Sequence, residues 1–349
     1  MTAAPRTPRV SIIIPCRNEA RYIGPCLDSI VATAYPEDRM EVLVVDGRST
    51  DATRDTIARY VAAHDWIHLL DNPDGTVPAA LNRGITQARG DVIVRMDAHV
   101  VYPPTYLPRL VAELEESKAD NVGGCIITLP ADETPVARAI AIALAHPFGV
   151  GNSYFRVGAA AARWVDTVPF GCFRRDVFRR VGLFDEELVR NQDDEFNFRL
   201  IRRGGRVRLV PDVVAYYYAR ASWRQVARMY YQYGYFKPLV ARKVGRVMTL
   251  RQLAPAAFVT ALALSGIAAL ALPASWPFLA GVAGSYAAVA LACAVPVVRR
   301  AGLRCALALL ATFPTLHIAY GIGFLRGAWD AVLGRRRAPA DARAVPLSR

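Results

Sequence analysis

An apolar run in the middle of the chain is followed at once by two side chains that can bind a metal ion. The run, Val92 to Met96, has the composition of a buried strand, and Asp97, Ala98 and His99 come next. Side chains alternate along an extended backbone, so Asp97 and His99 point to the same side. A carboxylate oxygen and an imidazole nitrogen at this spacing can share one divalent cation. An Asp that caps a turn and a His packed under a loop would give the same triplet, so the rest of the chain must decide.

A second group of chemically active side chains opens a predicted helix later in the chain. Asp193, Asp194 and Glu195 stand at its start, and Arg199 and Arg202 follow on later turns. Acids are common at a helix N-terminus because they stabilise the positive end of the helix dipole. Carboxylates are also groups that accept protons in catalysis. The residues themselves leave both interpretations open.

Apolar runs alternate with helical segments in the first hundred residues. The predicted strands are residues 10–15, 41–46, 67–70 and 92–96, and the predicted helices are residues 19–34, 52–60 and 78–88. This alternation predicts an α/β fold with a mostly parallel sheet and right-handed crossovers. Asp46 and Asp97 would then lie at the same edge of the sheet, where such folds bind ligands. Asn18 and either Ser49 or Thr50 are the expected helix caps.

The following segments are less regular. Two short strands are expected at residues 207–211 and 215–220, and an alanine-rich helix or interfacial segment at residues 134–151. Gly123 and Gly124 open another strand, where two glycines permit close approach by a ligand or mark a bulge.

Two classes of protein are disfavoured. A dinucleotide-binding oxidoreductase would carry Gly-x-Gly-x-x-Gly after the first strand, but the loop from Pro15 to Glu19 contains no glycine. The net charge of +13 would suit nucleic acid, yet the basic residues do not form patches interleaved with aromatic residues. Nucleic acid is therefore not an expected partner.

Residues 10–19, 42–53 and 91–99 resemble the nucleotide-sugar-binding half of family 2 glycosyltransferases, which have the GT-A fold. The family's usual Asp-Asp-Gly-Ser motif reads Asp-Gly-Arg-Ser from Asp46, and its Asp-x-Asp metal motif reads Asp-Ala-His from Asp97. Both departures, with Asn82-Arg-Gly, resemble the bacterial membrane-attached branch that builds exopolysaccharides such as succinoglycan. Imidazole suits Mn²⁺ at least as well as a carboxylate does and suits Mg²⁺ less, so His99 bears on metal preference and not on metal use.

The resemblance implies an inverting transfer from a nucleotide sugar, most simply a uridine diphosphate sugar. Its diphosphate would carry Mn²⁺ or Mg²⁺ held by Asp97 and His99. Asp193 aligns with the family's catalytic base when counted back from Arg199, and Asp194 is the alternative register. The nucleotide-sugar-binding residues implied are Pro15, Arg17, Glu19, Asp46, Asn82, Asp97, Phe170 and Gly171. Arg224 and Arg228 are weaker candidates for closing over the diphosphate.

The composition becomes alanine- and leucine-rich after about residue 250. Residues 253–272, 278–298 and 305–325 are long and apolar enough, or nearly so, to span a bilayer. Basic residues flank them, as expected beside an anionic cytoplasmic leaflet: Arg242, Lys243, Arg246, Arg251, Arg299, Arg300, Arg304, Arg335, Arg336 and Arg337. The family resemblance favours three spans. The last three arginines favour two, with the final apolar segment re-entrant or interfacial. Three is the expected number of spans.

The expected organisation is a flexible N-terminus (1–9), a GT-A domain (10–220), an amphipathic interface segment (221–250), transmembrane helices (251–327) and a basic tail (328–349). Six cysteines without disulfide or zinc spacing, and an N-terminus without a signal peptide, place the catalytic part in the cytoplasm. The expected partners are a nucleotide sugar, a lipid-linked or glycan acceptor and membrane lipid. The alternatives are an inactive membrane scaffold, which the acids Asp46, Asp97 and Asp193 disfavour, and a processive synthase, which would need more spans.

Overall fold

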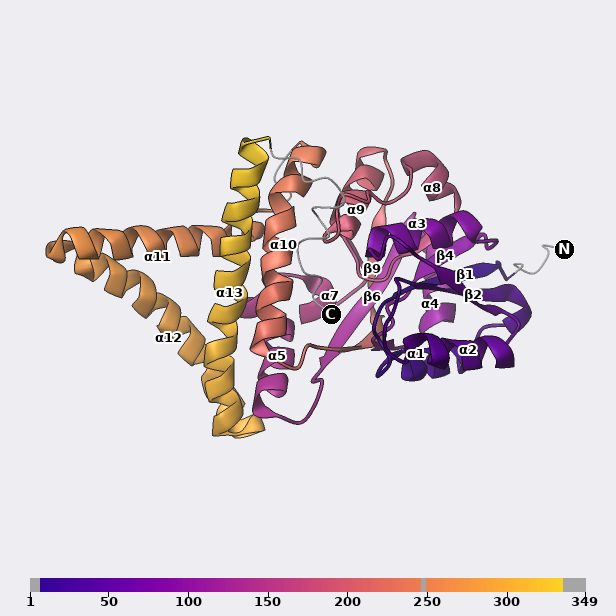
Figure 1. Ribbon diagram of the computed structural model, residues 1–349, viewed down its shortest axis with the longest axis horizontal. Helices are drawn as coiled ribbons and strands as arrows, with labels where there is room; N and C mark the ends of the chain where they lie inside the picture. The colour runs from indigo at the N-terminus through magenta and orange to yellow at the C-terminus, as the bar shows by residue number, and fades with distance from the viewer. Residues whose placement is uncertain (1–6, 246–248, 335–349) are drawn as a thin grey trace. The chain divides into compact units, whose positions relative to one another are not determined.

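The structure, a computed structural model, describes residues 7–245 and 249–334, and the chain divides into two compact units. One unit contains the chain up to Ile127 together with Gly158–Tyr217, and it holds nearly all of the sheet (Figure 1). The other contains Thr128–Val157 and the chain from Tyr218 onward, and it is helical. The predicted tails and the basic residues Arg246, Arg335, Arg336 and Arg337 lie wholly or partly outside the described residues.

Four parallel strands form one half of the sheet, in the order β3-β2-β1-β4. They are β1 (Val10–Cys16), β2 (Met40–Asp46), β3 (Ile67–Asp71) and β4 (Val92–Arg95). β1 and β2 are buried almost throughout, as expected of parallel strands covered by helices on both faces. Cys16 pairs with Asp46, and Asp46 with Asp71, so the carboxyl ends of three strands are level at one edge.

The sheet order continues β4-β8-β6-β9-β5 with β7 paired to β9. In this half β8 pairs antiparallel with β4 and β6, and β9 pairs antiparallel with β5 and β7. These strands are β5 (Val100–Val101), β6 (Asn121–Leu129), β7 (Arg163–Trp164), β8 (Cys172–Arg174) and β9 (Val207–Tyr218). The expectation of two short strands at 207–211 and 215–220 is wrong, because β9 runs through Pro211 without a break. Its partner β7 pairs at Leu209 and Arg208 and its partner β5 at Tyr216 and Tyr217, so neither needs the missing N–H of Pro211.

Helices flank this sheet at α1 (Ile23–Val31), α2 (Thr53–Ala63), α3 (Val77–Gln87), α4 (Tyr106–Ser117), α8 (Asp176–Val181) and α9 (Gln192–Arg202). Gly84 lets α3 pack closely on β1, since a Cβ there would lie 2.5 Å from Ile13 Cγ2. Gly123 and Gly124 leave room for the protein's own chain and not for a ligand. A Cβ at Gly124 would lie 2.0 Å from the Val213 carbonyl oxygen, and one at Gly123 would lie 2.5 Å from Val168 Cβ.

The helical unit contains α5 (Pro135–Ala145), α6 (Pro147–Val150), α7 (Tyr154–Val157), α10 (Trp223–Val244), α11 (Ala254–Ala271), α12 (Trp276–Ala301) and α13 (Leu303–Val332). Three helices here, α11, α12 (with the short turn before it) and α13, are long and apolar enough to cross a membrane. α12 and α13 contain the predicted apolar segments 278–298 and 305–325, and α11 is one residue shorter than segment 253–272 at each end. α13 continues through Pro314. The alanine-rich segment 134–151 folds as α5 and α6, and α5 packs against α13.

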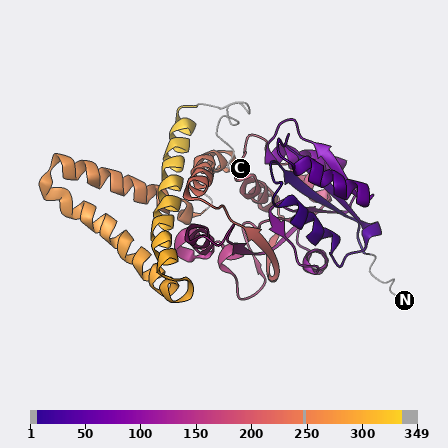
Figure 2. The ribbon, with the colours of Figure 1, turned by 60° about the horizontal axis from the view of Figure 1, so that its bottom comes forward.

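α10 and α13 are tightly packed partners. A Cβ at Gly323 or Gly327 of α13 would lie 2.1 Å from the carbonyl oxygen of Tyr231 or Tyr235 of α10, respectively. The Tyr235 hydroxyl donates to Asp330 Oδ2 at 2.8 Å. Figures 1 and 2 both show α10 alongside α13, whereas α11 and α12 form a hairpin that projects away from α13.

Candidate active site

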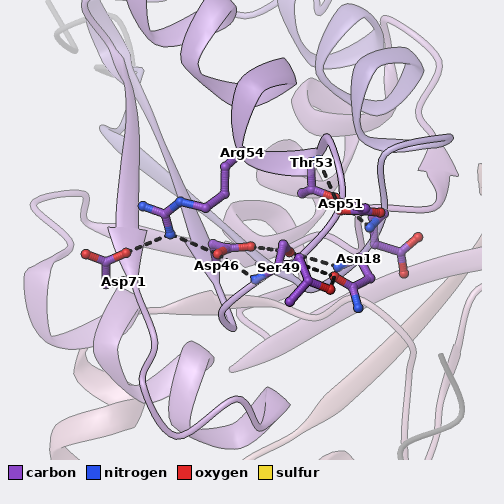
Figure 3. Close-up of polar contacts among 9 residues, drawn as sticks. Asn18, Asp46, Ser49, Asp51, Thr53, Arg54 and Asp71 are labelled. Atoms are coloured by element: carbon purple, nitrogen blue, oxygen red, sulfur yellow. Dashed lines mark hydrogen bonds and ion pairs between the residues drawn. The ribbon is translucent and has the colours of Figure 1, made fainter.

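Asp46, the last residue of β2, is fully buried and organises the loop that follows it. Its carboxylate accepts hydrogen bonds from the Ser49 backbone N–H at 3.1 Å and from the Ser49 hydroxyl at 2.5 Å (Figure 3). Arg54 Nη1 donates to Asp46 at 2.9 Å and also to Asp71 at 2.7 Å, which joins the ends of β2 and β3. The turn from Asp46 to Ser49 is thus closed by its own side chains, and Arg54 is a site residue that the sequence analysis missed.

The loop after β1 is tied to this turn by reciprocal hydrogen bonds. Asn18 Oδ1 accepts from the Thr50 backbone N–H, and Ser49 Oγ accepts from the Asn18 backbone N–H, both at 2.8 Å. The expectation that Asn18, Ser49 and Thr50 cap helices is therefore wrong, because their side chains join two loops instead. α1 begins only at Ile23, and α2 at Thr53.

Arg95, the last residue of β4, connects the two acidic parts of the predicted site. Its Nε donates to Asp97 Oδ1 at 3.1 Å and its Nη2 lies near Asp97 Oδ2, while its Nη1 donates to both oxygens of Asp193. The Arg95 side chain is 11% exposed, against 19% for Asp97 and 33% for Asp193. Sequence reasoning placed Asp97 and Asp193 in one site but missed Arg95. Its only signal was a charged residue in an otherwise apolar run.

The buried ion pair shapes the pKa values on both sides. Burial lowers the pKa of Arg95, but Asp193 and Asp97 outweigh this effect and hold it above its usual range. Burial raises the pKa of the Asp193 carboxyl, and Arg95 opposes that rise. Asp193 belongs to the first turn of α9, and Asp194 follows it there.

His99 is held by a buried carboxylate from the first loop. His99 Nδ1 lies 3.1 Å from Glu19 Oε1, and Glu19 is 6% exposed. The ring also contacts the Tyr217 ring edge-on, with centroids 5.2 Å apart. An Nδ1–H that donates to Glu19 leaves Nε2 as the nitrogen with a free lone pair, which is the tautomer a metal ligand needs.

Asp97 and His99 fit a divalent cation only if the bound nucleotide sugar supplies further ligands. Asp97 and His99 supply a carboxylate and an imidazole, and the described residues contain no group of three or more acids, histidines or cysteines suited to a metal. Two protein ligands suit an ion that takes its remaining ligands from phosphate oxygens and water. Both oxygens of Asp97 face Arg95 in this structure, so an incoming cation must compete with that arginine.

The remaining predicted site residues surround these groups or serve the fold. Phe170 is buried, and the Gly171 carbonyl accepts from the Arg95 backbone N–H at 3.0 Å. The Asn82 side-chain amide stabilises a loop by donating hydrogen bonds to the Phe184 carbonyl and to the Glu186 carboxylate, both at 2.9 Å. Arg17 is exposed beside the Gly75 carbonyl, and Pro15 is part of β1.

The sheet and site together define the class of protein: a nucleotide-sugar transferase of the GT-A fold, with acidic residues at the carboxyl ends of its parallel strands. Residues 11–182 match the family described as Glycosyl transferase family 2, and the chain belongs to this family. The predictions of fold and family are confirmed.

Relatives from bacteria and archaea share most of the chain. The succinoglycan biosynthesis protein ExoA of Rhizobium meliloti is 33% identical over 249 residues, covering 70% of this chain and 74% of that protein. A dolichyl N-acetyl-α-D-glucosaminyl phosphate 3-β-D-2,3-diacetamido-2,3-dideoxy-β-D-glucuronosyltransferase of Methanococcus voltae is 31% identical, with 67% and 74% covered. A mannosyltransferase from Pyrobaculum calidifontis, solved with GDP-Man and Mn²⁺, shares the fold with a TM-score of 0.57. It is 23% identical, with 93% of this chain and 88% of that chain covered.

Proposed function

We propose that this protein is an inverting glycosyltransferase that transfers a sugar from a uridine diphosphate sugar to a lipid-linked or glycan acceptor at the cytoplasmic face of the membrane. The observation that carries the proposal is the meeting of Asp97 and Asp193 at Arg95, because it joins a strand-end carboxylate to a helix-start carboxylate at one point. The names of two relatives, one from succinoglycan biosynthesis and one that names a dolichyl N-acetyl-α-D-glucosaminyl phosphate, support the class of acceptor.

The loops after β1 and β2 would hold the nucleoside. Asp46, Arg54 and the bonds between Asn18 and Ser49 make these loops rigid, so the donor would meet a preformed surface. Arg17 and Arg48 are exposed on the same loops and would face the negative donor.

Asp97 and His99 would hold Mn²⁺ or Mg²⁺, and Glu19 would orient the imidazole. A bound divalent cation stabilises the negative charge that develops on a leaving diphosphate. Asp193 would accept the proton of the acceptor hydroxyl while the hydroxyl oxygen forms its bond to the anomeric carbon. The bond to the diphosphate breaks on the opposite face and its electron pair leaves with the phosphate, so the configuration inverts. Asp194 remains the alternative base.

The helical unit would place this chemistry at a membrane. Large apolar side chains of α11 and α12 are exposed, with Leu270 90% and Phe278 73% accessible. Arg299 and Arg300 close the last turn of α12, as expected of a helix end that returns to the cytoplasm.

Membranes from cells with and without the chain, incubated with a panel of labelled nucleotide sugars, test the proposal. We expect one donor to label a lipid-extractable or glycan product of defined mass, with inverted anomeric configuration by NMR. Membranes that carry Asp193→Asn serve as the control and should give little product. If the wild type transfers no sugar from any donor yet binds uridine diphosphate, it is a binding scaffold and the proposal fails.

A further inference from the structure

Arg95 has an unusual position for a basic side chain. It ends a strand whose preceding residues are apolar, its side chain is 11% exposed, and carboxylates lie on two of its edges. Nε and Nη2 face Asp97, and Nη1 faces Asp193.

The charges explain why a cation is needed there. Asp97 and Asp193 are two acids at one poorly exposed point, and Asp194 adds a third carboxylate in the same first turn of α9 as Asp193. Like charges brought together without compensation repel strongly at low local dielectric. A guanidinium suits this task because its planar fork presents N–H groups along separate edges to the two carboxylates, whereas a lysine ammonium is a compact point charge.

We propose that Arg95 is a positioning residue with two tasks: it orients Asp193, and it serves as the countercharge of Asp97 until a divalent cation arrives. This inference rests on the proposed function for the identity of the site. Its test by Mn²⁺ binding does not require that the protein transfer a sugar. Arg95 and the cation compete for the Asp97 carboxylate. The protein without nucleotide should therefore bind metal weakly, and the metal should bind well only with the donor that brings it.

Mn²⁺ alone is the probe, added to full-length protein in detergent, with free Mn²⁺ measured by EPR. Arg95→Met should bind Mn²⁺ roughly tenfold more tightly than the wild type, because two acids lose their resident cation. Arg95→Lys keeps the charge and should stay within roughly threefold of the wild type. Asp97→Ala added to Arg95→Met should abolish the gain, which locates the metal at that carboxylate.

A matched control separates this role from simple structural pairing. Arg208 of β9 forms a half-buried ion pair with Glu113 of α4, on elements other than those that carry Arg95, Asp97 and Asp193. Arg208→Met should lower the melting temperature and leave Mn²⁺ affinity unchanged. If Arg95→Met also lowers the melting temperature without tightening Mn²⁺ binding, Arg95 is a structural ion pair and the inference is overturned.

Turnover supplies the second readout. Arg95→Lys should lower kcat roughly tenfold or more with a smaller change in donor KM, because the ammonium lacks the planar fork that fixes Asp193 and Asp97 along separate edges. A wild-type kcat in Arg95→Lys would contradict the orienting task. If the wild type transfers no sugar at all, the proposed function fails, but the Mn²⁺ comparison still decides the countercharge task.

Discussion

At the scale of single residues, backbone strain is concentrated in the loops of the site. Among the described residues, five non-glycine residues have positive φ, and Asn18, Arg48, Phe170 and Asn191 belong to loops at or next to the site. Such conformations cost on the order of 1–3 kcal/mol each and persist only where surrounding contacts enforce them. The hydrogen bonds of Asn18 to residues 49 and 50 are such contacts. Arg48, with φ 60°, stands where the family's usual motif has glycine. The left-handed backbone is therefore strained at this position, and the side chain places a positive charge on the loop.

Substitution of the metal ligands tests metal dependence directly. Asp97→Ala should abolish transfer, because it removes the carboxylate ligand and leaves Arg95 with one partner. His99→Asp should retain part of the activity and shift the preference from Mn²⁺ toward Mg²⁺, since Mg²⁺ prefers oxygen ligands. Initial rates against each metal are the measurement. Full activity of the wild type in excess chelator would show that no metal is used.

Two separate substitutions, Asp193→Asn and Asp194→Asn, test which acid is the catalytic base. Asp193→Asn keeps the shape but cannot accept a proton, so turnover should fall by roughly 10²–10⁴-fold while donor binding changes little. Single-turnover kinetics and titration with uridine diphosphate separate the two effects. A large loss in Asp194→Asn with a small one in Asp193→Asn would move the base by one residue.

At the scale of elements, close approach depends on glycines facing a neighbouring backbone. Gly84 allows α3 to approach β1 closely, and Gly323 and Gly327 allow α13 to approach α10 closely. A side chain in either of the last two would meet a carbonyl oxygen at 2.1 Å, so the helices would have to separate.

Gly327→Ala should therefore lower stability by roughly 1–3 kcal/mol, because an added methyl group overpacks the contact between α10 and α13. Gly281→Ala on α12 is the matched control. Apart from the neighbouring backbone of α12 itself, no atom of the described residues lies within 4 Å of a Cβ placed there, and alanine favours a helix, so stability should hold or rise slightly. Thermal unfolding in detergent measures both. Equal effects of the two substitutions would contradict this account of the packing.

At the scale of the whole molecule, the packing of α10 bears on the number of membrane spans. In the most apolar stretch of α11, and likewise in that of α12, 11% of the stretch is buried within the protein. In the corresponding stretch of α13 the buried share is 44%. α13 is covered by α10, which carries Arg224, Arg228 and Lys237. If α13 crossed the bilayer with α10 along it, these charges would enter hydrocarbon at a cost of several kcal/mol. This favours α13 lying at the interface, with α11 and α12 as the membrane hairpin.

We therefore expect two spans, and not the three expected from the sequence, with both ends of the chain in the cytoplasm. A topology reporter fused after Arg349 should give a cytoplasmic signal, and an external signal would show that α13 is a third span. A second reporter before Arg9 should also be cytoplasmic. An external signal there would reject the proposed orientation, because the site would then lie on the wrong side for cytoplasmic nucleotide sugars.

Local sequence patterns were sufficient to predict much of this protein. The β-branched runs, their alternation with helices and the acids after them predicted the α/β class, the strand ends at Asp46 and near Asp97, and three apolar helices. These features depend on neighbours within a few residues, where side-chain periodicity and composition act directly. The family motifs extended this reading to a GT-A fold.

Contacts between distant residues were decided only by the tertiary structure. Arg95 and Asp193 are 98 residues apart in sequence, and Trp223 and Thr312 of α10 and α13 are 89 apart. No local pattern records which distant group neutralises a buried charge or covers an apolar helix. That choice is made when the chain folds, because burial makes an uncompensated charge too costly to keep. Asn18 likewise depends on distant contacts: by itself it suits a helix cap, but it joins two loops that the parallel strands bring together.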